Sequence, residues 1–547
     1  MRKSVISVVL ISLFLLGSVS LSAQVSHGGK PCSFQKSNIL QALYFERLPY
    51  QDNQILLEEE TVAGKESGFQ FGKEIQVNYT LENSGVWDTL GDGSRLWRLG
   101  IYSQNAYSLN FFFDSFHIPQ GSNLFIYTND KSFVMGSFTE KNNNRWGNFA
   151  TSLFPGDKIV LEYYEPVQNK GLGIINLSTI VHGYKDFFFK KGTYGKSAAC
   201  HININCPQGE NYQTVKRSVA LILHKGSAHC SGTLINNTAQ DGIPYFLTAR
   251  HCIYYINSDK DTTYYNPSNF VFVFNYESSD CEGENEKTLY SYNGATLVAS
   301  HVHSDFALLL MNDIPQAEAM PYYAGWDSRN IAIVGAVGIH HPVGDMKKIS
   351  VSNGLLESEK FQDDDSSYPE NTHWNVVWDK GSTQGGSSGS GLFNTRQQII
   401  GQLEGGSAGC SGTKPNGLAD QYGKLAYSWT NGNSPDENRL DYWLDPLKTG
   451  AEVLSGFDPS GVSIVDYDNI ENNIKIYPNP AKDIVNIESD LEVLSCGVFT
   501  INGQCVDEIS IHSSSKDISV NNLPSGIYLL KIQTKQGLVH KKLIIQK

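Results

Sequence analysis

Three residues that can act together in nucleophilic catalysis occur along the chain in the order His, Asp, Ser. His251 ends the segment FLTARH, Asp305 precedes the apolar run FALLLM, and Ser388 lies in the stretch GGSSGSG. A serine hydroxyl is a weak nucleophile until a histidine takes its proton and a carboxylate orients that histidine. The residue types and their order therefore predict a catalytic triad, with His251 as general base, Asp305 as its partner and Ser388 as nucleophile.

The glycine- and serine-rich stretch DKGSTQGGSSGSGLFN, residues 379–394, has the composition of either a linker or a rigid loop. Linkers of this kind usually lie within other polar, unpatterned sequence. Here HWNVVW precedes the stretch and GLFNTRQQIIGQL continues it, and both segments are rich in strand-forming residues. We therefore expect a loop between two strands, in which the N–H groups of Gly386 and Ser388 form an oxyanion hole.

The same stretch matches the G-x-S-x-G nucleophile elbow of α/β-hydrolases, centred on Ser387. That fold needs a helix directly after the serine and the chain order serine, acid, histidine. The residues after the loop have strand and turn character, and the histidines that follow, His512 and His540, lie in the small C-terminal region. The elbow interpretation therefore fails on both requirements.

Two histidine pairs, HVH at 301–303 and HH at 340–341, also suggest zinc. Alternate residues of a strand share a face, so His301 and His303 have a spacing suited to one ion. No spacing in the sequence places a third ligand. We therefore predict neither a metal site nor a cofactor.

The first residues and the cysteines indicate secretion. Residues 1–23 contain Arg2, Lys3, an apolar core and small residues ending at Ala23, as a secretory signal peptide does, and no other stretch is expected to span a bilayer. Nine cysteines in a secreted chain are expected to form disulfides before they bind metal. The net charge of −14 argues against nucleic acid as a partner.

The 547 residues divide into regions that differ in composition and in the pattern of apolar residues. Short strands broken by Gly, Asn and Pro predict a β-sandwich in the N-terminal region, and periodic apolar residues predict a helix near 437–447. We expect a signal peptide at 1–23, a β-rich pro-region or N-terminal domain at 24–196, a protease domain at 197–457, a linker at 458–469 and a small domain at 470–547.

From about Cys200 to Gly456 the sequence resembles the secreted lysyl endopeptidases of the trypsin-like serine peptidases. The resemblance rests on the cysteines at 200 and 206 and on LINNTAQDGIPYFLTARHC, SDFALLLM, HHPVGDMKKIS, GSSGSGLF and DQYGKLAYSW. It implies a mainly β, chymotrypsin-like fold of two antiparallel β-barrels with the site between them. Spacing alone leaves fifteen pairings open for six cysteines, whereas the resemblance implies Cys200–Cys410, Cys206–Cys281 and Cys230–Cys252.

The resemblance also bears on the pocket for the substrate side chain. In trypsin the pocket acid lies six residues before the nucleophile, and here that position is Ser382. Lysyl endopeptidases take the acid from a later loop, which implies Asp420 in ADQYGK. Glu404 in QLEGG stands where the family has a pocket-edge histidine, and we expect it to bind substrate and to lie close enough to affect the pKa of His251. Two acidic residues in this pocket would favour a substrate with a lysine or arginine side chain.

The C-terminal segments YPNPAKD, LPSGIYLLKI and KLIIQK resemble the sorting domain of proteins exported by the type IX system of Bacteroidetes. This implies a small β-sandwich, recognition by the type IX machinery, passage through the outer membrane, and release or attachment at the cell surface. Residues 24–196 hold the position of a pro-region, and Lys190, Lys191 and Lys196 are candidate cleavage points before Cys200.

Taken together, the sequence predicts a secreted serine endopeptidase that cuts protein substrates after Lys, or after Lys and Arg, through an acyl-enzyme. One alternative is a glutamate-specific peptidase of the same fold, which would need a cationic pocket. Another is a catalytically inactive, protease-like surface binding protein. The presence of all three triad residues argues against this second alternative.

Overall fold

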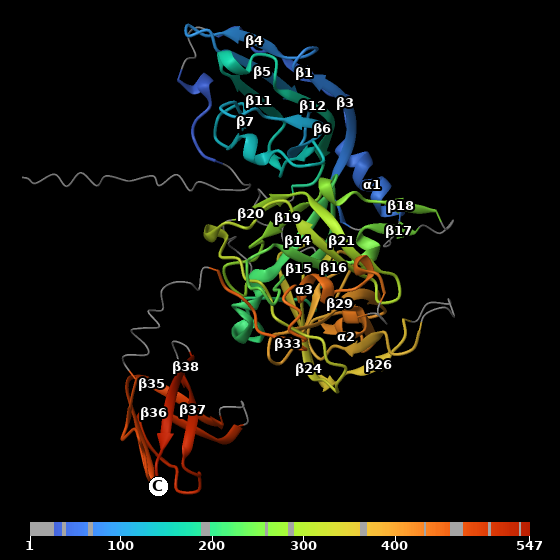
Figure 1. The fold of residues 1–547 in the computed structure, drawn as a ribbon. Coiled ribbons are helices and arrows are strands. Elements are labelled where there is room, and N and C mark those ends of the chain that lie inside the picture. Colours follow the sequence, from blue (N-terminus) through green and yellow to red (C-terminus); the bar gives the residue numbers. More distant parts are fainter. Residues whose placement is uncertain are drawn as a thin grey trace, which may run out of the picture. The chain divides into compact units, whose positions relative to one another are not determined.

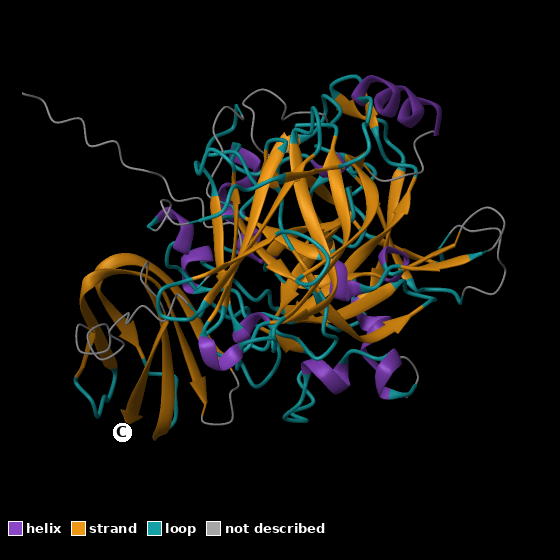
Figure 2. Ribbon diagram, turned by 90° about the horizontal axis from the view of Figure 1, so that it is seen from above, coloured by secondary structure: helices purple, strands orange, loops and turns teal. Residues whose placement is uncertain are grey.

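A computed structural model of the chain describes residues 27–35, 40–63, 69–186, 197–256, 261–282, 289–361, 369–430, 434–459, 474–500, 505–534 and 538–547. The chain forms two compact units, residues 1–457 and 458–547. Strands, orange in Figure 2, dominate both. The expected signal peptide, the three candidate cleavage lysines and most of the expected linker lie outside the described residues.

The N-terminal region folds as a sandwich of two sheets, blue to teal in Figure 1. Its elements are β1 (Phe45–Arg47), α1 (Asn53–Ala63), β3 (Gly72–Thr80), β4 (Val86–Thr89), β5 (Arg95–Tyr102), β6 (Ser108–His117), β7 (Asn123–Thr128), β8 (Val134–Phe138), β9 (Phe149–Ala150), β10 (Phe154–Pro155), β11 (Lys158–Glu165) and β12 (Ile174–Gly183). One sheet has the order β1-β5-β11-β7-β8, with β4 beside β5, and the other has the order β10-β6-β12-β3, with β9 beside β6. Large apolar side chains such as Trp97 and Phe111 fill the space between the two sheets.

The first barrel of the protease region is an antiparallel sheet of consecutive short strands. These are β14 (Val219–His224), β15 (Ser227–Ile235), β16 (Tyr245–Ala249), β19 (Val271–Phe274), β20 (Tyr290–Asn293), β21 (Ala295–His301) and β22 (Phe306–Met311). Their order is β20-β19-β14-β15-β16-β22-β21, and β2 (Phe69–Gln70) from the N-terminal region joins the sheet at β15. The strands are nearly continuous apolar runs because most of their residues are buried.

The second barrel follows in the chain. Its strands are β13 (Ile202–Asn203), β23 (Trp326–Asp327), β24 (Val334–His340), β25 (Lys348–Leu355), β26 (Glu357–Glu359), β27 (His373–Val377), β28 (Gly391–Asn394), β29 (Ile399–Gly406), β32 (Ala419–Lys424) and β33 (Val453–Leu454). The main path is β13-β25-β24-β28-β29-β32-β27-β26. One apolar core contains Leu247 and Leu308 of the first barrel together with Val337 and Phe393 of the second, so the two barrels are packed as one body.

Two small hairpins and two short α-helices also belong to this unit. The strand pairs are β17 (Tyr254–Ile256) with β18 (Thr262–Tyr264) and β30 (Cys410–Ser411) with β31 (Lys414–Pro415), and the helices are α2 (Leu425–Thr430) and α3 (Asp441–Leu444). The helix expected over 437–447 is therefore wrong in extent. Pro446 cannot continue it, and the Asp445 carboxylate instead accepts from the N–H groups of Thr449 and Gly450.

The C-terminal unit is a separate small β domain with its own apolar core. Its strands are β34 (Ile474–Tyr477), β35 (Ile484–Thr500), β36 (Cys505–Ser519), β37 (Gly526–Thr534) and β38 (Leu538–Ile545). They follow the order β34-β35-β37-β38, with β36 also paired to the long β35. Val485, Val498 and Leu530 are among the buried residues that hold the strands together. The expected fold class, mainly β with two barrels between two smaller β domains, is confirmed.

Candidate active site

His251 and Asp305 meet where two paired strands of the first barrel reach the site. His251 lies in a single turn directly after β16, and Asp305 directly precedes β22, which pairs with β16. His251 Nδ1 lies 2.7 Å from Asp305 Oδ2, and the backbone N–H of His251 donates to Asp305 Oδ1 over 2.9 Å. Because the carboxylate only accepts, the Nδ1 proton is fixed and Nε2 is left as the basic atom of the ring.

The backbone at Asp305 is held in an unusual conformation. Its φ is 48°, in the left-handed region that non-glycine residues seldom adopt. The Arg250 N–H donates to the Asp305 carbonyl over 2.6 Å, and Asp305 is only 5% exposed. The surrounding structure thus fixes both the main chain and the carboxylate, so the carboxylate is pre-oriented toward His251.

Two opposing effects set the pKa of His251. Burial lowers the pKa, whereas the Asp305 carboxylate raises it through its charge and its hydrogen bond, and the result is a pKa above the ordinary 6.5. The carboxylate therefore stabilises the imidazolium that forms when His251 accepts a proton.

The loop that carries Ser388 joins β27 to β28 and is tied to the first barrel. Ser231 of β15 donates its N–H to the Ser388 carbonyl over 2.8 Å and its hydroxyl to the Gly386 carbonyl over 2.9 Å. Gly389, at φ 80°, lies so close to the first barrel that an added Cβ would be 2.6 Å from the Ser231 carbonyl oxygen and 2.7 Å from the backbone nitrogen of Ala249. Ser388 is thus held beside the strand that leads into His251.

Two backbone donors in this loop are free for a ligand. Among the residues that the structure describes, neither the Gly386 N–H nor the Ser388 N–H has an acceptor. Gly386 has a φ of 87°, which a side chain at this position would disfavour. Free N–H groups on a rigid loop at a serine hydroxyl are the kind of donors that stabilise an oxyanion.

Ser388 and Asp420 line one cavity of about 780 Å³. Asp420, on β32, is 1% exposed, and its Oδ2 accepts hydrogen bonds of 2.7 Å from Trp378 Nε1 and from Thr383 Oγ1. Burial raises the pKa of Asp420 to about 6, although these hydrogen bonds lower it. Ser382, the position of the acid in trypsin, is a buried neutral residue. A buried carboxylate that lines a cavity can receive a cationic side chain.

Glu404 does not occupy the expected position in this cavity. Its Oε2 lies 2.6 Å from His373 Nε2 in the second barrel, and the Glu404 side chain is 9% exposed. Leu403 and Gly405 line the cavity, whereas Glu404 is not among the described residues that do so. The pairing of β29 with β32 shifts between Leu403 and Gly405, and the Glu404 side chain at this irregularity contacts His373.

Several residues of the cavity wall were not identified from the sequence, and two of them come from far before the catalytic loop. His201, just before β13, and Phe69 of β2 both line the cavity that contains Ser388. Phe69 lies more than one hundred residues before the protease domain begins, so no local pattern connects it to the site. The proximity of His201 to Cys200 was the signal that could have drawn attention to this histidine.

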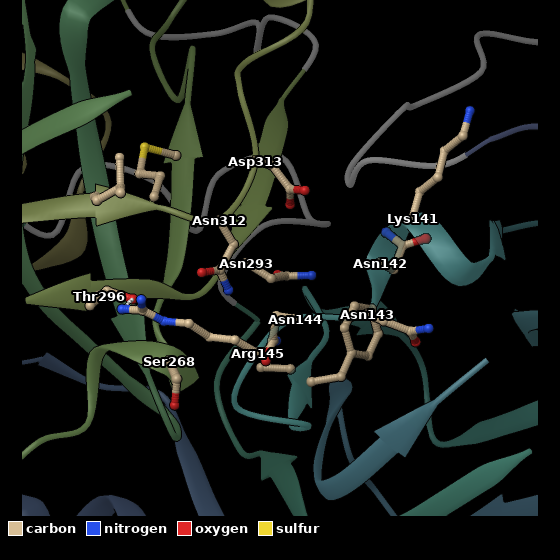
Figure 3. Close-up of a pocket in the computed structure, with 14 residues that line it drawn as sticks. Lys141, Asn142, Asn143, Asn144, Arg145, Ser268, Asn293, Thr296, Asn312 and Asp313 are labelled. Carbon is tan, nitrogen blue, oxygen red and sulfur yellow. Dashed lines mark hydrogen bonds between the residues drawn. The ribbon is translucent and has the colours of Figure 1, made fainter. Parts of the chain in front are cut away.

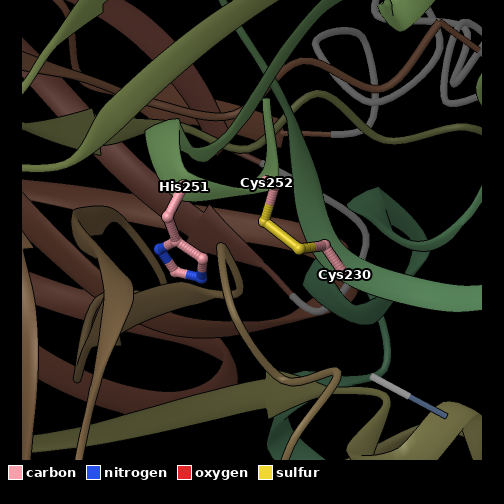
Figure 4. A group of neighbouring side chains, drawn as sticks. All are labelled: Cys230, His251 and Cys252. Carbon is pink, nitrogen blue, oxygen red and sulfur yellow. A yellow bond between two sulfur atoms is a disulfide. The ribbon is translucent and has the colours of Figure 1, made fainter. Parts of the chain in front are cut away.

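Three disulfides stabilise the protease region. They are Cys200–Cys410, Cys206–Cys281 and Cys230–Cys252, the pairs that the family resemblance implies. The last of these lies beside His251, as Figure 4 shows. Cys230, His251 and Cys252 also come close enough to hold a metal ion, but sulfurs joined in a disulfide are not thiolates and do not serve as such ligands.

The histidine pairs considered for zinc make hydrogen bonds within the fold. His340 Nδ1 lies 2.7 Å from the hydroxyl of Ser387, and His340 Nε2 lies 3.1 Å from the hydroxyl of Ser350. His341 Nδ1 donates to the Asp345 carbonyl over 3.0 Å. His340 therefore positions Ser387, the residue that precedes Ser388, and so has a structural role in the loop.

The protease region matches a known protein family. Residues 194–423 match the family described as the lysyl endopeptidase C-terminal domain. This domain is lysyl endopeptidase-like. A lysyl endopeptidase of Pseudomonas aeruginosa is 27% identical over 329 residues, which cover 57% of this chain and 63% of that protein. The chain thus spans less than two thirds of the length of this relative.

Solved structures that match part of this chain share little sequence with it. The active form of the Rv3671c protease of M. tuberculosis is 13% identical with a TM-score of 0.28, and covers 45% of this chain and 93% of its own. Kallikrein-related peptidase 10 is 16% identical with a TM-score of 0.27, and covers 40% of this chain and 97% of its own.

The C-terminal unit has a match of its own. Residues 475–546 match the secretion system C-terminal sorting domain. This lysyl endopeptidase-like protein therefore carries a tail that directs secretion or display at the cell surface. Among the described residues, no helix is both long and apolar enough to cross a membrane.

Proposed function

We propose that the lysyl endopeptidase-like domain is a serine endopeptidase that cleaves on the carboxyl side of lysine, and of arginine where its longer side chain fits. The observation that carries this proposal is the buried Asp420 carboxylate in the cavity that Ser388 also lines. A lysine ammonium that reaches this cavity exchanges water for an oriented carboxylate held by Trp378 and Thr383.

The proposed reaction uses the three residues of the candidate triad. His251 Nε2 takes the proton of the Ser388 hydroxyl, whose oxygen attacks the scissile carbonyl carbon. The resulting oxyanion accepts from the N–H groups of Gly386 and Ser388, and His251 returns the proton to the leaving amine. Water, deprotonated by the same histidine, then hydrolyses the acyl-enzyme, so the chemistry requires no cofactor.

Neither alternative has an observation in its favour. A glutamate-specific peptidase would need a cationic pocket, and the described residues that line this cavity include Asp420 but no lysine or arginine. An inactive binding protein would have no need of the 2.7 Å contact between His251 and Asp305 or of two free N–H groups beside a serine.

The test uses the matured protein and matched peptides that differ only in the residue before the cut, Lys, Arg, Glu or Leu. We expect cleavage after Lys, with or without Arg, and none by the Ser388→Ala variant. Cleavage after Glu or Leu would refute the role of Asp420. A folded, processed protein that cleaves none of the peptides would favour the binding-protein alternative.

We further propose that residues 1–23 direct export to the periplasm and that the type IX machinery of a Gram-negative, Bacteroidetes-type cell then moves the protein across the outer membrane. The match of residues 475–546 to a sorting domain supports this route. Deletion of these residues in a host with type IX secretion should leave the protein in the periplasm, and normal release would contradict the proposal.

A further inference from the structure

The strand that borders the substrate cavity is irregular at one residue. In its pairing with β32, strand β29 shifts between Leu403 and Gly405, so Glu404 is an extra residue without a partner in the register. An extra residue of this kind is a β-bulge, which bends its strand and disrupts the local ladder of hydrogen bonds. The bulge lies where the strand reaches the cavity, because Leu403 and Gly405 both line it.

The two strands approach each other closely just beyond the bulge. Gly406 of β29 lies opposite Asp420 of β32, and an added Cβ on Gly406 would be 2.6 Å from the Cα atom of Asp420 and 2.9 Å from its Oδ1 atom. Gly406 has no side chain that could absorb a movement of the β29 backbone. A displacement of the bulge would therefore pass directly to the wall of the cavity around Asp420.

The side chain of the extra residue is anchored on a strand two places away. The sheet has the order β29-β32-β27, and Glu404 Oε2 lies 2.6 Å from Nε2 of His373, the first residue of β27. The contact thus bridges β32, the strand that carries Asp420. The Glu404 side chain is 9% exposed and His373 is fully buried, so water competes little for this hydrogen bond.

The imidazole ring of His373 is held on both sides. A carboxylate only accepts hydrogen bonds, so the Nε2 atom of His373 carries a proton and donates it to Glu404. Its Nδ1 atom lies 2.8 Å from the hydroxyl oxygen of Thr372. The ring of Phe361 packs against the imidazole, with 5.5 Å between the two ring centroids. His373 is therefore a fixed point to which the bulge is attached.

The contact between Glu404 and His373 lies behind the cavity and not in it. Val376 of β27 is opposite Asp420, and His373 comes three positions before Val376. Side chains alternate along a strand and directly opposite residues share a face, so His373 points to the face of the sheet away from Asp420. Neither His373 nor Glu404 is among the described residues that line the cavity. The pair can therefore influence a substrate only through the strands that it joins.

Burial distinguishes this contact from other polar contacts beside a cavity. In the cavity between the sandwich and the first barrel, Figure 3 shows Arg145 extending toward Thr296, and its guanidinium donates to Thr296 Oγ1 over 2.9 Å. Arg145 is exposed, so that bond can open without leaving a buried group unpaired. Loss of Glu404 would leave a buried N–H of His373 without this acceptor, so the structure resists the separation of the pair.

We propose that Glu404 and His373 are positioning residues, whose hydrogen bond fixes the bulge of β29 and thereby the width of the cavity at Asp420. A cavity of fixed width favours the slender side chain of lysine over the broader guanidinium of arginine. The inference rests on the proposed peptidase function and deepens it. It assigns part of the choice between lysine and arginine to a pair of residues that does not touch the substrate.

The test uses the processed protein and two peptides that differ only in lysine or arginine before the cut. Glu404→Ala removes the acceptor, and we expect the ratio of lysyl to arginyl kcat/KM to fall about tenfold, mainly through a higher KM for the lysyl peptide. Glu404→Gln keeps an oxygen that accepts from His373, so it should retain most of the selectivity. Glu357→Ala truncates an exposed glutamate of β26 in the same sheet, and this matched control should behave like the unmodified protein.

A second substitution separates a positioning role from a general loss of stability. His373→Phe keeps a ring in the buried site and removes the donor, so it should lower the ratio as Glu404→Ala does. If both residues act through one hydrogen bond, the double variant should be little worse than either single variant. Melting temperatures report on the fold, and a merely structural role would lower them without changing the ratio of lysyl to arginyl cleavage.

An unchanged ratio in a folded Glu404→Ala variant would overturn the positioning proposal and leave the peptidase untouched. Equal losses in Glu404→Ala and Glu404→Gln would also overturn it, because the charge of Glu404, and not its hydrogen bond to His373, would then act on the substrate. The peptidase itself is tested by the unmodified processed protein. If that protein cleaves neither peptide, the proposed function fails, and the positioning proposal fails with it.

Discussion

At the residue scale, Asp420 carries the charge on which the proposed selectivity depends. Its carboxylate is buried and held by Trp378 and Thr383, so it cannot relax toward solvent when a cation is absent. Asp420→Asn keeps the size and removes the charge. We expect kcat/KM for a lysyl peptide to fall about 100-fold, the order of loss when one member of a buried charge pair is removed.

The matched control for Asp420→Asn is a peptide with norleucine in place of lysine, which keeps the hydrocarbon chain of lysine and lacks the ammonium. The kcat/KM for the norleucyl peptide should be nearly the same in the Asp420→Asn variant as in the unmodified protein. An equal loss for both peptides would mean that Asp420 shapes the cavity and does not read the charge.

The pH dependence of selectivity follows from two different groups. Cleavage needs neutral His251, and the charge of Asp305 raises the pKa of this histidine above its ordinary value. The rates for all substrates should therefore fall as the pH drops through the raised pKa of His251. Attraction of lysine needs the Asp420 carboxylate, which gains a proton as the pH falls through about 6. The ratio of kcat/KM for the lysyl and norleucyl peptides should therefore decline below about pH 6, whereas a constant ratio would contradict the role of Asp420.

The hydrogen bond between His251 and Asp305 gives a further test. Asp305→Asn offers an amide where the imidazole needs an acceptor, so His251 is expected to present a proton to Ser388 when it should accept one. We expect kcat to fall on the order of 10⁴-fold with little change in KM. Stability should be compared by thermal unfolding, and a loss of kcat below tenfold in a folded variant would argue against the triad.

At the scale of elements, Gly389 allows the catalytic loop to approach the first barrel. Gly389→Ala would place a Cβ 2.6 Å from the Ser231 carbonyl oxygen at a φ of 80°, so the loop must move. We expect kcat/KM to fall at least about 100-fold, because an ångström-scale displacement of a reacting group has an effect of this size. Gly354→Ala, where an added Cβ meets nothing within 4 Å, is the control and should keep full activity.

The elements also explain why Glu404 was misplaced from the sequence. The family comparison correctly drew attention to its position on β29, between two residues that line the cavity. The direction of its side chain depends on the irregular pairing of β29 with β32 at this point and on His373 of β27, thirty-one positions earlier in the chain. A motif gives the position of a residue along the chain but not the face from which its side chain projects.

At the scale of the whole molecule, the disulfides close loops of very different length. Cys200 and Cys410 are 210 positions apart, and Cys230 and Cys252 are 22 apart. In the chain-entropy model the longer loop stabilises more, by about 2 kcal/mol. Urea unfolding of the full chain with Ser388→Ala should therefore show a larger loss of stability when the first pair is replaced by serine than when the second pair is. The reverse order would show that local packing, not loop closure, determines the contribution.

The sequence by itself determined the mainly β fold class, and it predicted the candidate triad and Asp420. The fold class depends on local strand patterns. The candidate site residues depend on short motifs such as FLTARHC and GGSSGSG, which contain the residue types that nucleophilic catalysis by serine requires. The extent of the helix near 437–447 was misjudged because Pro446 and the Asp445 turn outweigh its apolar periodicity.

Only the tertiary structure decided which distant side chains share the site. It placed Phe69 in the cavity of Ser388, turned Glu404 toward His373, and joined the N-terminal sandwich to the protease through one apolar core. Such contacts depend on how sheets pack and which strand edge remains open, and these are properties of the assembled chain. Local sequence carries no record of them because packing contacts are non-directional and can be made by many residue types.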